Sequence, residues 1–202
     1  MEIGCCILED LEMKCRFCNT ELAQLVVDLG TSPLSNAFLE ETSLDKKEPF
    51  YPLRVYVCHE CFLVQLGDNV RPPKEIFSKY LYFSSYSTTW LKHAKDLADE
   101  IIEKFDCDQN TNVIEIASND GYLLQHFKDN NIPGLGIEPA TNVAKIAEER
   151  GIKTVNKFFG LDTANDLKES GNQADILLAI NVLPHVPDLH DFLKGIKVIL
   201  KS

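Results

Sequence analysis

The spacing of apolar and polar positions changes along the chain, and the change separates two kinds of structure. Between residue 13 and about residue 70 the apolar residues form short runs, at 22–29, 53–57 and 62–66, with prolines at positions 33, 49 and 52 between the first two. Such runs are typical of short strands and turns. From Leu91 onward apolar residues recur every three or four positions, which predicts a helix with one apolar face. After this helix, strand-like and helix-like segments alternate.

The alternating region predicts a parallel sheet with helices on both faces, because parallel strands need helical crossovers. The expected fold class is therefore α/β, with a small β-rich module followed by a Rossmann-like sheet. Predicted strands cover 113–117, 135–137, 152–155 and 174–180, and predicted helices cover 121–127, 141–150 and a segment marked by Leu189, Phe192, Leu193 and Ile196.

Four segments follow from these patterns. Residues 1–12 are expected to be an N-terminal appendage, 13–70 a β-rich module and 91–202 the Rossmann-like domain. Residues 71–90 are rich in aromatic and hydroxyl side chains. Two interpretations stay open for them: a linker whose rings cover an apolar seam, or a lid that offers stacking faces and hydrogen bonds to a ligand.

Composition and charge narrow the classes of function. The chain has 202 residues, 45% hydrophobic and 25% charged, which is ordinary for a globular protein. Its net charge of −11 and the lack of a Lys/Arg run disfavour binding to nucleic acid or anionic membranes. No apolar stretch reaches the roughly 18 to 20 residues that span a bilayer. No basic region precedes the short apolar patch near the start, so we expect a cytoplasmic protein.

Four of the seven cysteines form two C-x-x-C pairs, Cys15 with Cys18 and Cys58 with Cys61. Two such pairs can close a tetrahedral site around Zn²⁺, although the segment between them is longer than in a usual zinc ribbon. In a reducing compartment a metal site is favoured over disulfides. Redox dithiols and an iron–sulfur cluster remain alternatives. A zinc ion with four sulfur ligands would be structural.

Three loops are predicted at the carboxyl ends of the parallel strands, where ligands bind in such sheets. They are residues 115–121, 134–139 and 180–185. The first lacks the glycines of a dinucleotide fingerprint, which disfavours NAD, because a pyrophosphate needs close backbone approach. It carries acids instead, which favours a cationic ligand without phosphate. S-adenosylmethionine (SAM) fits that description.

Two acids of these loops are candidate ligands of the cofactor. Glu138 follows Gly121 at close to the spacing, about 20 residues, at which an acid meets ribose hydroxyls. Glu138 could instead be a solvated acid at a strand end. Glu115 could instead stabilise a nearby helix terminus.

Beyond these local features, the chain resembles one known family over its whole length from about residue 13. The family is that of the zinc-containing nucleotide-sugar C-methyltransferases, which are class I SAM-dependent enzymes. The resemblance rests on the two cysteine pairs and on residues 29–36, 51–53, 64–66, 80–87, 115–121, 136–140 and 181–189.

The resemblance implies two cofactors, SAM and Zn²⁺, and a nucleotide-linked deoxy-keto sugar as substrate. It implies the following cofactor-binding residues: Glu115, Ala117, Asn119 and Gly121 for the methionine and ribose, Glu138 for the ribose hydroxyls, Phe158 and Phe159 for the adenine, Asn181 near the methionine end, and Tyr80, Tyr82 and Ser85 over the cofactor or sugar nucleotide. The reaction would remove a proton next to a ketone, and the enolate would attack the sulfonium methyl. His185 is the candidate base, with a hydrogen bond at a helix start as its alternative role.

The chain departs from the family in length, since family members continue for roughly as long again. The rest of the sheet and the main catalytic residues would lie in that part. We therefore expect an incomplete domain with little activity alone, and an open sheet edge that favours self-association or a separate chain that supplies the rest. A non-catalytic or decayed zinc- and SAM-binding module, and a nucleotide-dependent oxidoreductase, are the alternative functions.

Overall fold

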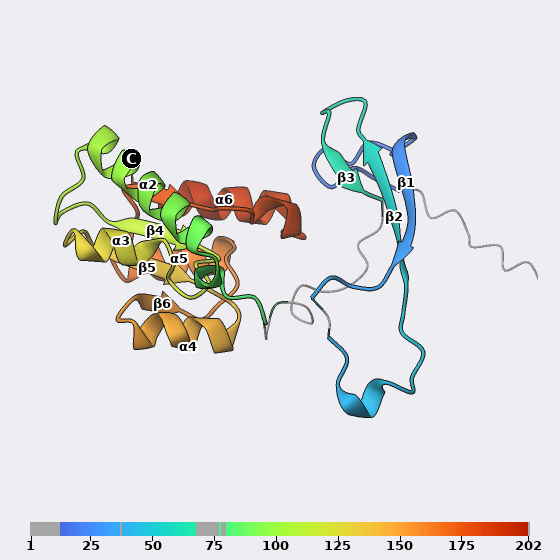
Figure 1. Ribbon diagram of the computed structural model, residues 1–202. Coiled ribbons are helices and arrows are strands. Elements are labelled where there is room, and N and C mark those ends of the chain that lie inside the picture. The colour runs from blue at the N-terminus through green and yellow to red at the C-terminus, as the bar shows by residue number, and fades with distance from the viewer. Residues whose placement is uncertain (1–12, 37, 68–76, 78–79, 202) are drawn as a thin grey trace, which may run out of the picture. The chain divides into compact units, whose positions relative to one another are not determined.

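The structure is a computed structural model that describes residues 13–36, 38–67, 77 and 80–201 (Figure 1). The chain divides into two compact units, residues 1–70 and 71–202, which are described separately. The predicted appendage, and residues 71–76, 78 and 79 of the predicted linker, lie outside the described residues. None of the described helices combines the length and the apolar character that crossing a bilayer requires.

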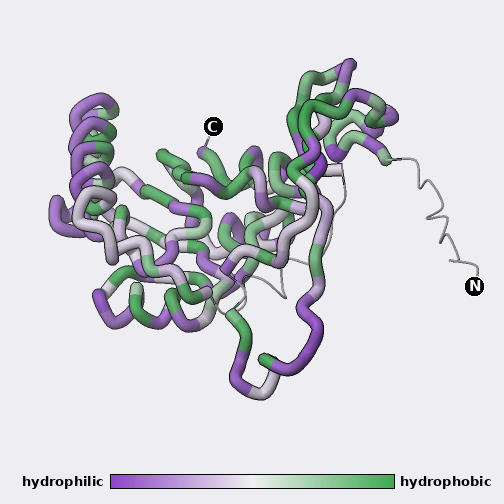
Figure 2. The backbone as a smooth tube through the Cα atoms, turned by 45° about the vertical axis from the view of Figure 1, so that its right-hand side comes forward, coloured by the Kyte–Doolittle hydropathy of each residue, from purple (hydrophilic) through white to green (hydrophobic). Residues whose placement is uncertain are grey.

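Unit 1 contains a three-stranded antiparallel sheet in the order β1-β2-β3. Its elements are β1 (Gln24–Ser32), a 3₁₀ turn η1 (Glu41–Ser43), β2 (Tyr51–Val57) and β3 (Val64–Leu66). The long connection between β1 and β2 is largely hydrophilic (Figure 2). The described core of this unit is small and is centred on Cys15, Leu22, Tyr56 and Cys58. So small a core leaves a large part of the stability to the cysteine cluster.

Unit 2 contains a parallel sheet in the order β6-β5-β4-β7, which confirms the predicted α/β fold class. The strands are β4 (Val113–Ile116), β5 (Gly134–Ile137), β6 (Lys153–Val155) and β7 (Ile176–Leu178). The helices are α2 (Thr88–Phe105), α3 (Leu124–Asp129), α4 (Thr141–Glu149), α5 (Leu161–Glu169) and α6 (Leu189–Ile199), with 3₁₀ turns η2 (Ser84–Tyr86) and η3 (Leu183–His185).

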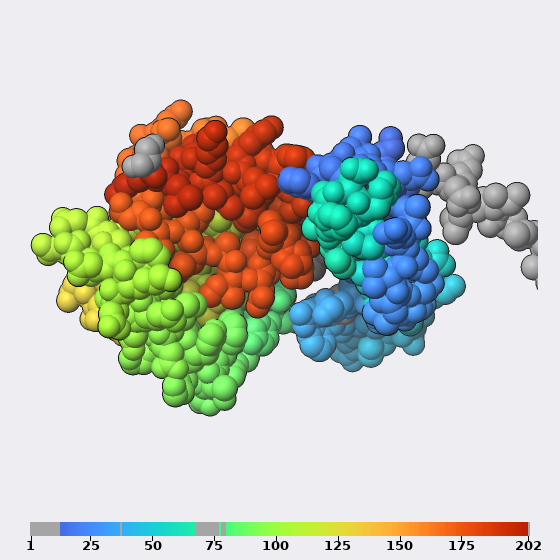
Figure 3. Space-filling model, turned by 90° about the horizontal axis from the view of Figure 1, so that it is seen from above, coloured from blue at the N-terminus to red at the C-terminus, as the bar shows by residue number. Residues whose placement is uncertain are grey.

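The two faces of this sheet carry separate apolar clusters. Successive side chains of β4 point to opposite faces of the sheet. Val113 therefore packs in the cluster with α2 and α3, whereas Ile114 and Ile116 pack in the cluster with α5 and α6. Figure 2 shows the matching alternation of hydrophobic and hydrophilic residues along the helices, and Figure 3 looks onto the surface where α2 and α6 lie. By the same alternation, the side chain of Glu115 belongs to the face of Val113, among apolar neighbours.

Several element boundaries differ from the predicted ones because backbone conformation overrides the apolar pattern. Strand β4 ends at Ile116 because Ala117 has a left-handed backbone, with φ of 55°. Helix α3 begins at Leu124 rather than at Gly121, whose φ is 77°. Helix α5 was absent from the predicted elements. Its buried side chains are Thr163, Ala164 and Leu167, which are too few and too small to produce a clear apolar stripe.

Strand β7 is the last named strand on its side of the described sheet. It pairs with β4 along one edge. Beyond its other edge the described contact is an isolated parallel bridge between Ala174 and Leu200. The residues of β7 are half-buried, whereas those of β4 are buried.

Candidate functional site

The four predicted metal ligands meet at one place in unit 1. The sulfur atoms of Cys15, Cys18, Cys58 and Cys61 all lie within 4.8 Å of one another. The shortest separations cross between the two pairs, at 3.5 Å from Cys15 to Cys61 and 3.4 Å from Cys18 to Cys58. A zinc ion bound to four sulfurs at about 2.3 Å holds them roughly 3.8 Å apart. The four thiols are free and fit such a tetrahedral ion.

A buried glutamine that the sequence analysis did not single out supports this cluster. Gln65 on β3 donates from Nε2 to Sγ of Cys15 over 3.2 Å. Its Oε1 accepts the backbone N–H of Arg16 over 3.0 Å. One amide therefore fixes both a ligand sulfur and the backbone of the first cysteine pair. The sequence offered one signal, a polar residue between the apolar residues of a predicted strand.

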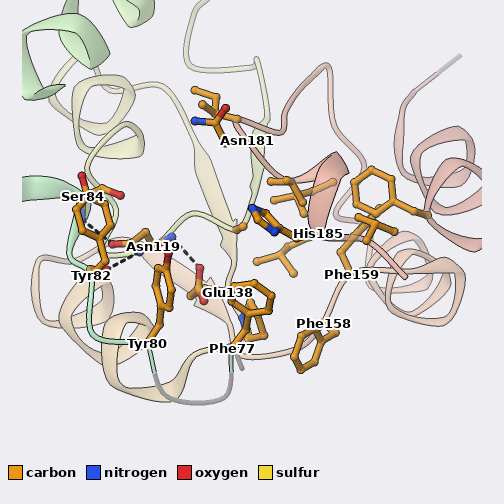
Figure 4. Close-up of a pocket in the computed structure, with 18 of the residues that line it drawn as sticks. Phe77, Tyr80, Tyr82, Ser84, Asn119, Glu138, Phe158, Phe159, Asn181 and His185 are labelled. Atoms are coloured by element: carbon orange, nitrogen blue, oxygen red, sulfur yellow. Dashed lines mark hydrogen bonds between the residues drawn. The ribbon is translucent and has the colours of Figure 1, made fainter. Parts of the chain in front are cut away.

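Unit 2 contains a cavity of about 400 Å³ at the carboxyl ends of β4 and β5 (Figure 4). This volume lies within the range of small-molecule sites. Of the residues expected to meet cofactor or substrate, the following line it: Tyr80, Tyr82, Ala117, Asn119, Glu138, Phe158, Phe159, Asn181 and His185. Among the described lining residues there is no lysine or arginine, so the wall offers no permanent cation to a phosphate.

Glu138 is the carboxylate of the cavity wall, and the protein holds it in place. Its Oε2 accepts the backbone N–H of Asn119 over 2.9 Å, and its Oε1 accepts that of Ala140 over 2.8 Å. Burial raises the pKa of Glu138 above its ordinary value, although the two N–H donors act in the opposite direction. Each carboxylate oxygen can accept a further bond. The arrangement suits a ligand that brings hydroxyl donors.

Glu115 does not line the cavity, in contrast to the prediction that it does. It is 1% exposed. Its carboxyl accepts a hydrogen bond from Tyr122, and its Oε2 has no hydrogen-bond partner. Burial, and then the charges of Glu138 and Asp120, raise its pKa well above the ordinary value, against the hydrogen bond from Tyr122. The acid lies behind the wall because the strand alternation turns it toward the α2 and α3 face.

Gly121 and Ser85 also lie outside the described cavity wall. Gly121 packs against α4 and against Ile152, the residue before β6, where an added Cβ would lie 2.9 Å from Cγ1 of Ile152. The hydroxyl of Ser85 bonds the buried carboxylate of Asp120 and accepts a bond from Arg150 over 3.1 Å. Both residues therefore support neighbouring parts of the wall.

His185 lies in η3, after β7, with an exposed side chain at the cavity. Its ring meets the edge of Phe77 at a centroid separation of 5.5 Å. The backbone N–H of His185 bonds the carbonyl of Val182, so its main chain takes part in a helical turn while the imidazole remains at the cavity.

Several lining residues were not predicted as site residues, chiefly Phe77, Ser84, Trp90 and Tyr122. Three of them belong to the aromatic stretch 71–90, for which the sequence left open a lid or a linker. Tyr122 looked like an ordinary helix residue. Its position directly after a loop at a strand end was the signal available.

An open parallel sheet with a cavity at its strand ends defines an α/β cofactor-binding domain. The chain belongs to the methyltransferase family, since residues 90–202 match the family model of a methyltransferase domain. Residues 15–77 match that of a zinc binding domain. The predicted cofactors, zinc and SAM, are confirmed at the level of the family. The match also decides against the oxidoreductase alternative.

Among curated proteins, the chain is similar to the C-methyltransferase NovU of Streptomyces niveus, with 28% identity over 187 residues. The match covers 93% of this chain but 44% of that protein. The chain therefore spans less than half the length of this relative.

Solved structures with similar regions include YcgJ of Bacillus subtilis (17% identity, TM-score 0.44) and a SAM-dependent methyltransferase of Thiobacillus denitrificans with S-adenosyl-L-homocysteine (15%, 0.41). A third is DesVI of Streptomyces venezuelae (16%, 0.42). The matches cover 55% of this chain in each case, and 47%, 44% and 47% of those chains in the same order.

Proposed function

We propose that the cavity of unit 2 is the SAM site, and that the chain belongs to an enzyme that methylates a carbon of a nucleotide-linked deoxy-keto sugar. One observation carries the first part. The described wall presents the Glu138 carboxylate and no lysine or arginine. A sulfonium ion attached to a ribose suits that wall, whereas the pyrophosphate of a dinucleotide does not.

Different residues of the wall would contact different parts of SAM. Glu138 would accept bonds from the two ribose hydroxyls, and Phe158 and Phe159 would pack against the adenine. Asn119 and Asn181 would offer polar groups toward the methionine end. Glu115 lies one layer behind this wall, and burial raises its pKa well above the ordinary value, so we assign it no electrostatic role toward the ligand.

SAM, when bound, supplies an electrophilic methyl group. The protein must remove a proton from the carbon next to the ketone. We assign that step to His185, whose imidazole lies at the cavity and suits proton transfer near neutral pH. In the longer protein, His185→Asn would then reduce methyl transfer far more than it weakens SAM binding.

We assign the methyl acceptor, the molecule that receives the methyl group, from the relatives of this chain rather than from the described wall of the cavity. NovU is named a C-methyltransferase, which supports carbon as the acceptor atom. The family resemblance supplies the nucleotide-linked keto sugar. The diphosphate of such a substrate needs cations, so we place its binding outside the described wall of this cavity.

The experiment that tests this function is methyl transfer to a nucleoside-diphosphate deoxy-keto sugar, followed by mass spectrometry of the product. The chain by itself and a version of the protein as long as the curated relative would be compared. With the longer protein, we expect the product to carry the new methyl group on a carbon of the sugar. A methyl group on oxygen or nitrogen would contradict the assignment.

A second candidate is a module that binds zinc and SAM without turnover. The exposed side chain of His185 favours it for this chain alone, because proton abstraction from carbon is efficient where water is excluded. Turnover by the isolated chain would eliminate this candidate.

We also propose that the edge of β7 associates with a second copy of this chain. The half-buried strand has a named partner strand on one side in the described sheet. Exposed backbone groups at such an edge recruit further strands. Light scattering is expected to detect a dimer or larger species, and a monomer at high concentration would contradict this.

A further inference from the structure

The aromatic segment 80–86 forms one wall of the cavity without pairing to the sheet. Its main-chain groups are held by side-chain amides from two other elements. Asn142, in the first turn of α4, makes both of its bonds to one residue. Its Oδ1 accepts the backbone N–H of Tyr80 over 3.0 Å, and its Nδ2 donates to the Tyr80 carbonyl over 2.6 Å.

Asn119 holds the next part of the segment in the same way. Its Nδ2 donates to the carbonyl of Tyr82 over 3.1 Å, and its Oδ1 accepts the backbone N–H of Ser84 over 2.9 Å (Figure 4). A third attachment follows at Ser85, whose hydroxyl meets Asp120 and Arg150. The segment is thus tied to α4, to the loop after β4 and to the end of α4.

The rings carried by this segment continue around the cavity. Tyr80 lies 5.8 Å from Phe77 and 6.4 Å from Tyr82 between ring centroids, and Phe77 in turn contacts His185. Figure 4 shows the Tyr80 ring beside Glu138. A shift of the Tyr80 backbone would therefore move the rings that face the ligand.

We propose that Asn142 is a positioning residue: its amide fixes Tyr80, and thereby the aromatic wall, in the conformation that binds SAM. The proposal rests on the SAM site proposed above. Asn142 does not line the described cavity, so it acts through Tyr80. A primary amide suits the task, because it presents a donor and an acceptor side by side.

The replacement Asn142→Asp separates this role from a structural one. Aspartate keeps the acceptor for the Tyr80 N–H but cannot donate to the Tyr80 carbonyl when ionised. In the first turn of α4 its charge is favourable to the helix dipole. The dipole gain and the lost bond roughly offset each other, so we expect a melting temperature close to that of the wild type, together with a Kd for SAM about tenfold higher, the effect of losing one good hydrogen bond.

Two further variants complete the experiment. Asn142→Ala loses both bonds, so its Kd should rise at least as much and the amides of 80–86 should exchange hydrogen faster. Asn130→Ala is the matched control, because Asn130 also donates from Nδ2 to a backbone carbonyl, that of His126 over 2.8 Å, at the exposed end of α3. Its SAM affinity and its exchange at 80–86 should equal those of the wild type.

The outcomes are separable. Wild-type affinity in both Asn142 variants would overturn the proposal, and so would an equal loss in the Asn130 control. A folded wild-type chain that binds no SAM would overturn the proposed site and the link to affinity together. Hydrogen exchange at 80–86 without ligand would then decide alone whether Asn142 fixes the segment.

Discussion

The backbone N–H of Asn119 donates to the carboxylate of Glu138 over 2.9 Å, joining the loop after β4 to the end of β5. The bond forms because Asn119 adopts a left-handed conformation, with φ of 50°, that turns its N–H toward the neighbouring strand. The carboxylate is thus fixed before any ligand arrives, which reduces the ordering that binding would require. A fixed acid at this strand end is the centre of the proposed cofactor site.

Replacing Glu115 by glutamine should change how stability depends on pH. Burial raises the pKa of Glu115 well above its ordinary value of 4.5. When folding raises the pKa of an acid, the acid's stabilising contribution is complete below the ordinary pKa. That contribution is lost as pH rises through the raised pKa of the folded state. Glu115→Gln should therefore gain stability relative to the wild type as pH rises from about 5 to 8. Melting temperatures across this range test it, and parallel profiles would refute it.

Replacing Ala117 by glycine should stabilise the chain. Ala117 holds a φ of 55°, which costs a residue with a Cβ about 1–2 kcal/mol. Glycine removes this cost but adds about 0.5–1 kcal/mol of backbone entropy, so a net gain of up to about 1.5 kcal/mol is expected. Ala140→Gly, at a φ of −79°, is the control and should destabilise. Chemical denaturation measures both, and a destabilised Ala117→Gly would contradict the strain argument.

Removing a zinc ligand should unfold unit 1. Cys58 is completely buried in the cysteine cluster, so Cys58→Ser should lose the metal and the folded zinc module. Structural zinc contributes on the order of 10 kcal/mol to folding of such modules. Cys107→Ser, in unit 2, should retain one zinc per chain. Metal analysis after gel filtration distinguishes the two, and a Cys58→Ser protein with full zinc content would rule out the four-cysteine site.

Gln65 should influence the metal without being a ligand. Gln65→Leu removes the N–H donor to the Cys15 sulfur while filling a similar volume. Loss of such an outer partner typically lowers metal affinity by roughly 10- to 100-fold. A chelator competition assay should show weaker zinc binding, and the Co²⁺-loaded protein should show shifted thiolate charge-transfer bands. Wild-type affinity and spectrum would mean that the bond has no effect on the metal.

The residues that could be predicted are those whose chemistry is local. Cysteine spacing predicted the metal cluster, and the acid at the end of a strand run predicted Glu138 on the cavity wall. The class of the sheet followed from the alternation of apolar runs, since that pattern is repeated over many residues.

The rest depended on three-dimensional relationships that no local pattern contains. Glu115 was expected in the wall, but its side chain shares the face of Val113, and which face of β4 borders the cavity depends on the helices packed against the sheet. Ser85 and Asp120 meet beside Arg150, which follows α4 and contacts both side chains. The role of Asn142 as a partner of Tyr80 requires two segments that are far apart in the sequence.

The central claim, that the Glu138 cavity binds SAM, is tested most directly by calorimetric titration of the zinc-loaded chain with SAM, with NADH as the control ligand. The account predicts saturable one-to-one binding of SAM, no binding of NADH, and a roughly 10- to 100-fold weaker affinity in Glu138→Gln, as for loss of a charged hydrogen bond. No binding by a folded chain, or unchanged affinity in a folded Glu138→Gln variant, would contradict it.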